Sequence, residues 1–173
     1  VEQDNPDIIL EIDFSPDGLD RIQKILYVQA LTSDLIGKNV LKKQAKIFSV
    51  VFTASHQTYA DAILNYLDPE NKFIQYRLYR HHCYQTPENY YVKDLRVISN
   101  RDLSEMVLID NSVYSFAYQL SNGVPIVPFY REPPKDEEML HLIYYLSCLA
   151  QVPDVRVQNM QAFELHKLGG NEA

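Results

Sequence analysis

The most constraining feature of this chain is an apolar run that ends abruptly in polar residues, Met106–Ile109 followed by Asp110 and Asn111. Short apolar runs bounded by turn formers are typical of buried strands in parallel sheets. In open α/β sheets, ligands bind just beyond the carboxyl ends of such strands. The sequence therefore predicts an α/β fold with a mainly parallel sheet, and it places Asp110 and Asn111 at the ligand-binding edge.

Two further polar side chains fall at predicted strand ends. The apolar run Ile47–Phe52 is followed by Thr53, which puts a hydroxyl group at the end of a second strand. Lys93 lies between the two runs, in the short segment Tyr91–Leu95. A hydroxyl, a lysine and an aspartate thus occur in this order, each at the end of a predicted strand.

This order resembles that of the haloacid dehalogenase superfamily, and six short segments narrow the resemblance. They are similar to motifs of the RNA polymerase II C-terminal-domain phosphatases, and most similar to the small-phosphatase, or NLI-interacting-factor-like, branch. The segments are Val51–Ser55, Tyr59–Asp61, Leu67–Pro69, Tyr91–Leu95, Arg101–Ser104 and Asp110–Ser112. The resemblance covers about residues 27–156 and implies a haloacid dehalogenase-like (Rossmann-like), doubly wound sheet.

The resemblance also implies roles for individual residues. Asp110 would hold a magnesium ion, with Asn111 supporting its loop on the substrate side, and Thr53 would hydrogen-bond the phosphoryl oxygens. Lys93 would neutralise the nucleophile and the phosphate, and Arg80 would face the substrate phosphate. Each residue also has a purely structural role open to it, because an Asp-Asn pair can cap a helix, Thr53 can bond nearby backbone, and Lys93 can pair with its neighbour.

The nucleophile of the resembled family is missing from the sequence. It lies in an Asp-x-Asp-x-Thr motif, and no Asp-x-Asp occurs in these 173 residues. One interpretation is an N-terminal β-hairpin, with strands Ile8–Phe14 and Ile25–Val28 joined through a turn at residues 16–18, and a nucleophile strand upstream of Val1. The alternative makes Ile8–Leu10 the first core strand and Glu11–Ser15 a degenerate copy of the motif.

Two functions follow from these interpretations. The first is a phosphatase-like domain without catalytic equipment, a binding or structural subunit like the phosphatase-like subunit of the mitochondrial inner-membrane translocase. Its protein contacts are expected along Phe73–Tyr91, which is rich in tyrosine and arginine. The alternative is a magnesium-dependent protein serine/threonine phosphatase whose nucleophile motif lies upstream of the given residues. Magnesium is an expected cofactor only in this second case. An unrelated α/β module is a third possibility.

Bulk composition limits the remaining classes. The length fits a single domain over residues 1–173, and the net charge of −7 disfavours a nucleic-acid partner. Two cysteines are too few for a disulfide scaffold, and no apolar run reaches the roughly 20 residues of a membrane helix. We therefore expect an intracellular protein, nuclear, cytoplasmic or mitochondrial, that works with a protein partner or in a larger assembly.

Periodicity predicts the other elements. Helices are expected over residues 34–46, from about residue 60 to 67, and from about residue 136 to 149, and residues 124–129 are expected to form an edge strand because they contain two prolines. His81, His82 and Cys83 are adjacent, but neighbouring residues do not easily converge on one metal ion. We expect no metal site there.

Overall fold

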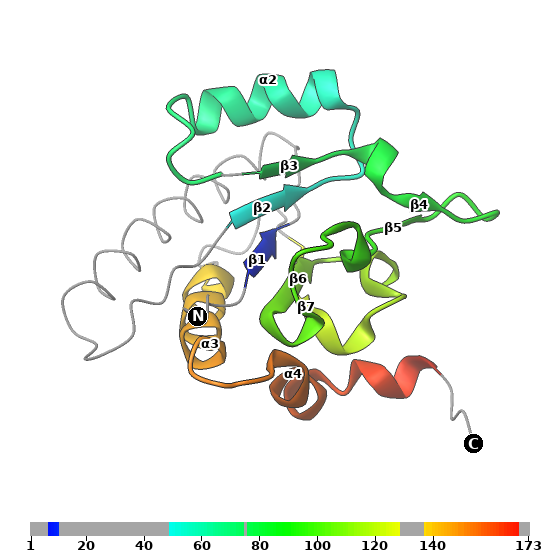
Figure 1. Cartoon of the computed structure of the whole chain (residues 1–173), viewed down its shortest axis with the longest axis vertical. Helices are drawn as coiled ribbons and strands as arrows, with labels where there is room; N and C mark the ends of the chain where they lie inside the picture. The colour runs from blue at the N-terminus through cyan, green and yellow to red at the C-terminus, as the bar shows by residue number, and fades with distance from the viewer. Residues whose placement is uncertain (1–6, 11–48, 75, 129–136, 170–173) are drawn as a thin grey trace.

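The computed structural model describes residues 7–10, 49–74, 76–128 and 137–169. Its centre is a five-stranded, wholly parallel sheet with the strand order β3-β2-β1-β6-β7 (Figure 1). The strands are β1 (Asp7–Leu10), β2 (Ser49–Phe52), β3 (Tyr76–Leu78), β6 (Met106–Asp110) and β7 (Gly123–Pro125). The predicted α/β class and the parallel sheet are confirmed. Strand β7 lies at the edge of the sheet, as expected, but it ends at Pro125 and does not extend through Pro128.

The position of β1 corrects one prediction. Leu10 pairs with Val51 on one side and with Ile109 on the other, both in parallel, so β1 is the central strand of the main sheet. An antiparallel hairpin beginning at Ile8 is therefore wrong for residues 8–10, and the alternative interpretation of these residues as a core strand holds. The expected hairpin partner, Ile25–Val28, lies outside the described residues, as does the helix expected over 34–46.

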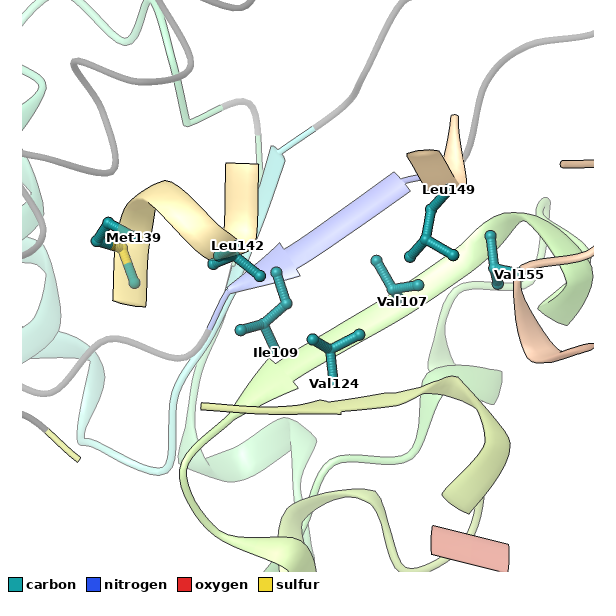
Figure 2. Close-up of a cluster of buried hydrophobic side chains, with 7 residues drawn as sticks. All are labelled: Val107, Ile109, Val124, Met139, Leu142, Leu149 and Val155. Carbon is teal, nitrogen blue, oxygen red and sulfur yellow. The ribbon is translucent and has the colours of Figure 1, made fainter. Parts of the chain in front are cut away.

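The described α-helices pack on one face of the sheet. Because Leu10 is in register with both Val51 and Ile109, the latter two point to the same face. Val51 packs against Ala60 and Leu64 of α2 (Gln57–Leu67). Figure 2 shows Ile109 beside α3 (Glu138–Leu149), in a cluster that the first residue of α4 (Val155–Phe163) completes. The cluster comprises Val107, Ile109, Val124, Met139, Leu142, Leu149 and Val155.

Short 3₁₀ helices and loops cover the opposite face. Phe52 and Leu108 pack there with Leu95 of η2 (Leu95–Val97) and Phe116 of η4 (Val113–Phe116), and all four side chains are buried. Since β2 and β6 are buried on both faces, their sequences are continuous apolar runs rather than alternating ones. This is why the sequence signal for these two strands is strong.

Two local features shape the loops near the sheet. Asp68 is buried after the end of α2, and its carboxylate accepts backbone hydrogen bonds from Lys72, Phe73 and Ile74 at 2.8–2.9 Å. A separate two-stranded hairpin, β4 (Tyr84–Gln85) and β5 (Tyr91–Val92), turns at Asn89, whose φ of 67° suits asparagine. This hairpin leads directly into Lys93.

Candidate functional site

The C-terminal ends of the central strands meet at one edge of the sheet. Strands β2 and β6 flank β1, and all three run in the same direction. Thr53 directly follows β2, and Asp110 is the last residue of β6. The structure therefore places Thr53 and Asp110 on near-adjacent strand ends, with one strand between them, at the edge where the sequence predicted a ligand site.

Lys93 and Asp110 form a buried ion pair at this edge. Lys93 Nζ lies 2.8 Å from Asp110 Oδ2, and neither side chain is exposed. The backbone of Lys93 is held as well, because its N–H donates to the carbonyl of Ser115. A fully buried ammonium group needs a counter-charge nearby. The structure thus joins Lys93 to Asp110, and Asp94 pairs with Arg96 instead.

The Asp110 carboxylate has hydrogen-bond donors on both oxygens. Oδ2 accepts from Lys93, and Oδ1 accepts from the backbone N–H of Ser112 at 2.7 Å. No group of three or more His, Cys, Asp or Glu residues that could hold a metal occurs in the described part of the chain. Magnesium prefers six oxygen ligands and binds a single carboxylate weakly. The described residues alone therefore do not fit a magnesium site, and the metal role of Asp110 stays a prediction.

Thr53 and Asn111 occupy different environments. Thr53 is buried, and its Oγ1 accepts from the backbone N–H of Ser55 at 3.1 Å, which leaves its hydroxyl proton available for donation. This is the local backbone bond expected of Thr53 in its structural role. Asn111 is exposed, and the next 3₁₀ helix begins without a side-chain cap. Capping by Asn111 is therefore not what the structure shows.

Arg80 lies close to the residues that follow Thr53. Its Nε donates to the carbonyl of Ala54, its Nη1 lies 2.9 Å from His56 Nε2, and its guanidinium lies 5.0 Å from the ring centre of Tyr91. Tyr91 comes two residues before Lys93. Arg80 is thus held at the rim of the strand-end edge. Sequence reasoning missed His56, although its position three residues after Thr53 was a usable signal.

The tyrosines of the segment Phe73–Tyr91 differ in exposure, and Tyr91 is half-buried. Tyr76, Tyr84 and Tyr90 are exposed, as expected of contact residues. Tyr79 is buried in the core beside α2, and its hydroxyl donates to Asp61 at 2.6 Å. Burial and this hydrogen bond raise the pKa of Tyr79 to about 12. Tyr79 is therefore a packing residue rather than part of an exposed surface.

Of the two adjacent histidines, His82 has a structural role, whereas His81 is exposed. His82 Nδ1 accepts the backbone N–H of Tyr79 at 2.9 Å, which holds the short 3₁₀ helix η1 (Arg80–His82). Burial, and then the neighbouring His81, lower the pKa of His82. The ring of His82 is thus engaged with the backbone of its own 3₁₀ helix.

Most of the chain is similar in sequence to one family of known proteins. A family model described as NLI interacting factor-like phosphatase matches residues 37–156. A Dictyostelium discoideum protein named CTD small phosphatase-like protein 2 is 46% identical over 129 residues, which are 74% of this chain and 22% of the relative. The chain thus spans about a fifth of the length of this relative.

Two further comparisons extend this result. The mitochondrial import inner membrane translocase subunit TIM50 of Candida glabrata is 35% identical over 109 residues, 62% of this chain and 22% of that protein. The solved structure of Fcp1, titled an essential RNA polymerase II CTD phosphatase, aligns with a TM-score of 0.51 at 13% identity, covering 98% of this chain and 55% of Fcp1. The Fcp1 likeness supports the haloacid dehalogenase-like fold. In the described segments, no helix is both long and apolar enough to cross a membrane.

Proposed function

The chain belongs to the NLI interacting factor-like phosphatase family, and from this premise we propose that it is a phosphatase-like domain that binds a protein partner without hydrolysing phosphate. The observation that carries the proposal is the register of β1, which occupies the central position between β2 and β6. The residue that follows this strand in the sequence is Glu11, where the family motif begins with its nucleophilic aspartate.

The chemistry of the family explains why this exchange matters. An attacking aspartate forms an aspartyl-phosphate, which splits a difficult hydrolysis into two easier steps. Glutamate carries one more methylene group, and a misplacement of about 1 Å can cost about 100-fold in rate. Removing a covalent nucleophile commonly costs several orders of magnitude. Lys93, Asp110 and Thr53 then remain as the frame of a phosphate site that lacks its attacking group.

A magnesium-dependent protein serine/threonine phosphatase is the second candidate. The buried Lys93–Asp110 pair favours it, because the two groups that the resemblance assigns to charge neutralisation and metal binding are both present and in contact. This candidate requires a nucleophile strand upstream of Val1. The position between β2 and β6 is occupied by β1 (Asp7–Leu10), which argues against a second strand at this position of the sheet.

The exposed tyrosines support a protein-binding role. The rings of Tyr90 and Tyr114 stack at 4.3 Å, and those of Tyr84 and Tyr118 lie 5.6 Å apart, so the hairpin β4–β5 and the η4 region carry four tyrosines that are each about half exposed. Arg96 lies over Tyr118 at 5.5 Å. Tyrosine and arginine are enriched where interfaces concentrate their binding energy. We expect the partner to cover this surface, within an intracellular assembly.

An activity assay on the 173-residue chain tests the proposal. With an aryl phosphate and millimolar magnesium, the wild type is expected to show no turnover above a blank without enzyme. The matched variant Glu11→Asp, which restores the family's nucleophile type, serves as the comparison. We expect it to gain magnesium-dependent turnover that chelation removes. Wild-type turnover that is lost on chelation and on Asp110→Asn would overturn the proposal and establish the enzyme.

A further inference from the structure

The rings of Tyr90 and Tyr114 form a parallel stack that bridges two elements of the fold. Their centres lie 4.3 Å apart, and the angle between the ring planes is 15°. Tyr90 directly precedes β5, and Tyr114 lies in η4, so the two phenols come from separate segments of the chain. The residues are 46% and 53% exposed, which leaves both rings accessible to small molecules in solution. Two phenol groups are therefore held face to face at the surface.

The backbone supports both sides of this stack. Within the hairpin β4–β5, the N–H of Thr86 donates to the carbonyl of Tyr90 at 2.9 Å. Between the two elements, the N–H of Lys93 donates at 2.8 Å to the carbonyl of Ser115, the residue after Tyr114. The short distance between the rings thus depends on main-chain hydrogen bonds as well as on the stacking itself.

A second tyrosine pair on the same surface provides an internal comparison. The rings of Tyr84 and Tyr118 lie 5.6 Å apart at an angle of 48°, so they are farther apart and less parallel. The guanidinium of Arg96 also lies 5.5 Å from the centre of the Tyr118 ring. A positive charge over an aromatic ring is attracted to the ring electrons and opposes the removal of one. This second pair is therefore less suited to oxidation than the first.

Two other tyrosines near the hairpin are less suited for related reasons. Tyr91 is half-buried, and its ring centre lies 5.0 Å from the guanidinium of Arg80. Tyr79 is buried, and burial together with the hydrogen bond to Asp61 raises the pKa of Tyr79 to about 12. A phenol that holds its proton tightly gives it up less readily on oxidation. Among the described tyrosines, the stacked pair is the one best placed to react.

A one-electron oxidant joins two such phenols in a defined way. Each ring loses one electron and its phenolic proton, and the unpaired electron spreads to the ring carbons next to the oxygen-bearing carbon. Two of these carbons, one from each ring, form a carbon–carbon bond, and the hydrogen on each then moves to the neighbouring oxygen, which restores two phenols. The pair loses two electrons and two protons in total. Hydrogen peroxide takes up both and becomes two molecules of water.

We propose that Tyr90 and Tyr114 are an oxidative modification site, at which a one-electron oxidant driven by peroxide links the two rings as dityrosine. Lys93 lies three residues after Tyr90, and Asp110 lies four residues before Tyr114, so the link closes a loop around the buried ion pair. It fixes the hairpin to η4 and restricts the unfolded chain, as other covalent cross-links do. The site does not depend on whether the chain hydrolyses phosphate.

Oxidation of the dilute 173-residue chain with a haem peroxidase and hydrogen peroxide tests the proposal. The intact mass of the monomer is expected to fall by two hydrogen atoms, with the fluorescence of a linked biphenol. Cys83 and Cys148 are free thiols, so the mass is measured after reduction, which reverses any disulfide and leaves the carbon–carbon bond. Because the two rings are already adjacent, coupling within one chain is favoured over coupling between chains. The yield of the link should not change with protein concentration.

Peptide masses and four variants identify the linked residues. Cleavage after Glu88 separates Tyr84 from Tyr90, so the linked peptide shows which hairpin tyrosine has reacted. Tyr90→Phe and Tyr114→Phe keep an aromatic ring but have no phenolic hydroxyl, and each is expected to lose the link. Tyr84→Phe and Tyr118→Phe are the matched controls and are expected to keep it. Circular dichroism checks that all five proteins have the same fold.

A measurement on the wild type needs no variant. Oxidation in concentrated urea is expected to give mixed tyrosine links without a preference for residues 90 and 114, because the stack exists only in the folded chain. After oxidation of the folded chain, the linked protein is expected to unfold at a higher urea concentration than the unlinked protein. A preference for the same two residues in urea would show that the folded geometry does not direct the reaction.

Other results would also overturn the inference. They are a monomer that loses no hydrogen, a link that persists in Tyr90→Phe or Tyr114→Phe, and an equal loss of the link in Tyr84→Phe or Tyr118→Phe. A yield that rises in proportion to protein concentration would assign the link to collisions between chains. Phosphatase turnover by the chain would refute the proposed function and leave this modification site standing.

Discussion

Lys93 Nζ and Asp110 Oδ2 lie 2.8 Å apart with neither side chain exposed to solvent, so a lysine from the loop after β5 is neutralised by an aspartate at the end of β6. The two residues are 17 positions apart in the sequence. The contact lies at the C-terminal end of the sheet, and the backbone of Lys93 is hydrogen-bonded to Ser115 of η4. A charge pair this deeply buried makes each partner dependent on the other.

We therefore expect Lys93→Met to destabilise the fold by about 3–5 kcal/mol, because it leaves the Asp110 carboxylate buried without its cation. Asp110→Asn is expected to be destabilising too, since it leaves the ammonium group buried. The double variant should cost clearly less than the sum of the two single changes. Urea denaturation of all four proteins measures this coupling. Strict additivity would mean that the two charges do not stabilise each other.

A side chain at position 123 is expected to clash with its neighbours. A Cβ built there would lie 2.6 Å from Cδ2 and 2.7 Å from Cγ of Phe116, whose ring is fully buried beneath β7. Gly123→Ala should therefore lower the free energy of unfolding by about 1–3 kcal/mol through overpacking. Combining it with Phe116→Leu makes room, so the double variant should lose less than the two single losses together. Thermal or urea unfolding tests this, and a neutral Gly123→Ala would contradict the close approach.

Asp94 is expected to give the fold an acid-sensitive contribution. Its carboxylate accepts the side chain of Arg96, and this bond, together with those from the Arg96 N–H and Gln119, holds the pKa of Asp94 below its usual value despite partial burial. A lowered folded-state pKa means that the stabilisation is present above about pH 4 and is lost as the pH falls through the folded-state value.

Two variants separate the charge of Asp94 from its role as the cap of η2. Asp94→Asn keeps an oxygen for the Arg96 N–H, whereas Asp94→Ala removes it and should cost about 1 kcal/mol or more at pH 7. For Asp94→Asn, the difference in unfolding free energy from the wild type should shrink between pH 5 and 2.5. A difference that is constant over this range would show that the charge contributes nothing.

Strands and helices with a strong local sequence pattern were predicted from the sequence, whereas the pairing of strands was not. The continuous apolar runs of β2 and β6 predicted two buried strands, since only strands covered on both faces lack polar alternation. The helix expected from about residue 60 begins at Gln57, and that expected from about 136 to 149 runs from Glu138 to Leu149. Helix ends are set by capping and loop packing, so periodicity located the helices better than their first residues.

The role of β1 could not be decided locally. The residues Ile8–Leu10 are apolar and mostly β-branched, which suits a hairpin strand and a core strand equally. Only the parallel pairing with Val50 and Leu108, which are distant in sequence, selects the core position, because strand order depends on contacts that periodicity does not record. The same is true of Tyr79 and Tyr76. Tyr79 is buried against α2 and Tyr76 is exposed, and no local sequence pattern distinguishes the two.

The fold class, the family and the side chains at strand ends could be predicted from hydrophobic runs and ordered motifs, because these are local properties of the chain. Which of those side chains contact one another depends on the folded arrangement of the strands. Lys93 pairs with Asp110 and not with its neighbour Asp94, and Arg80 meets His56 across 24 positions of the chain. The pairing of charged side chains depends on their distance in the folded state and on the cost of removing them from water. Both depend on the assembled sheet, so they cannot be read from the order of residues.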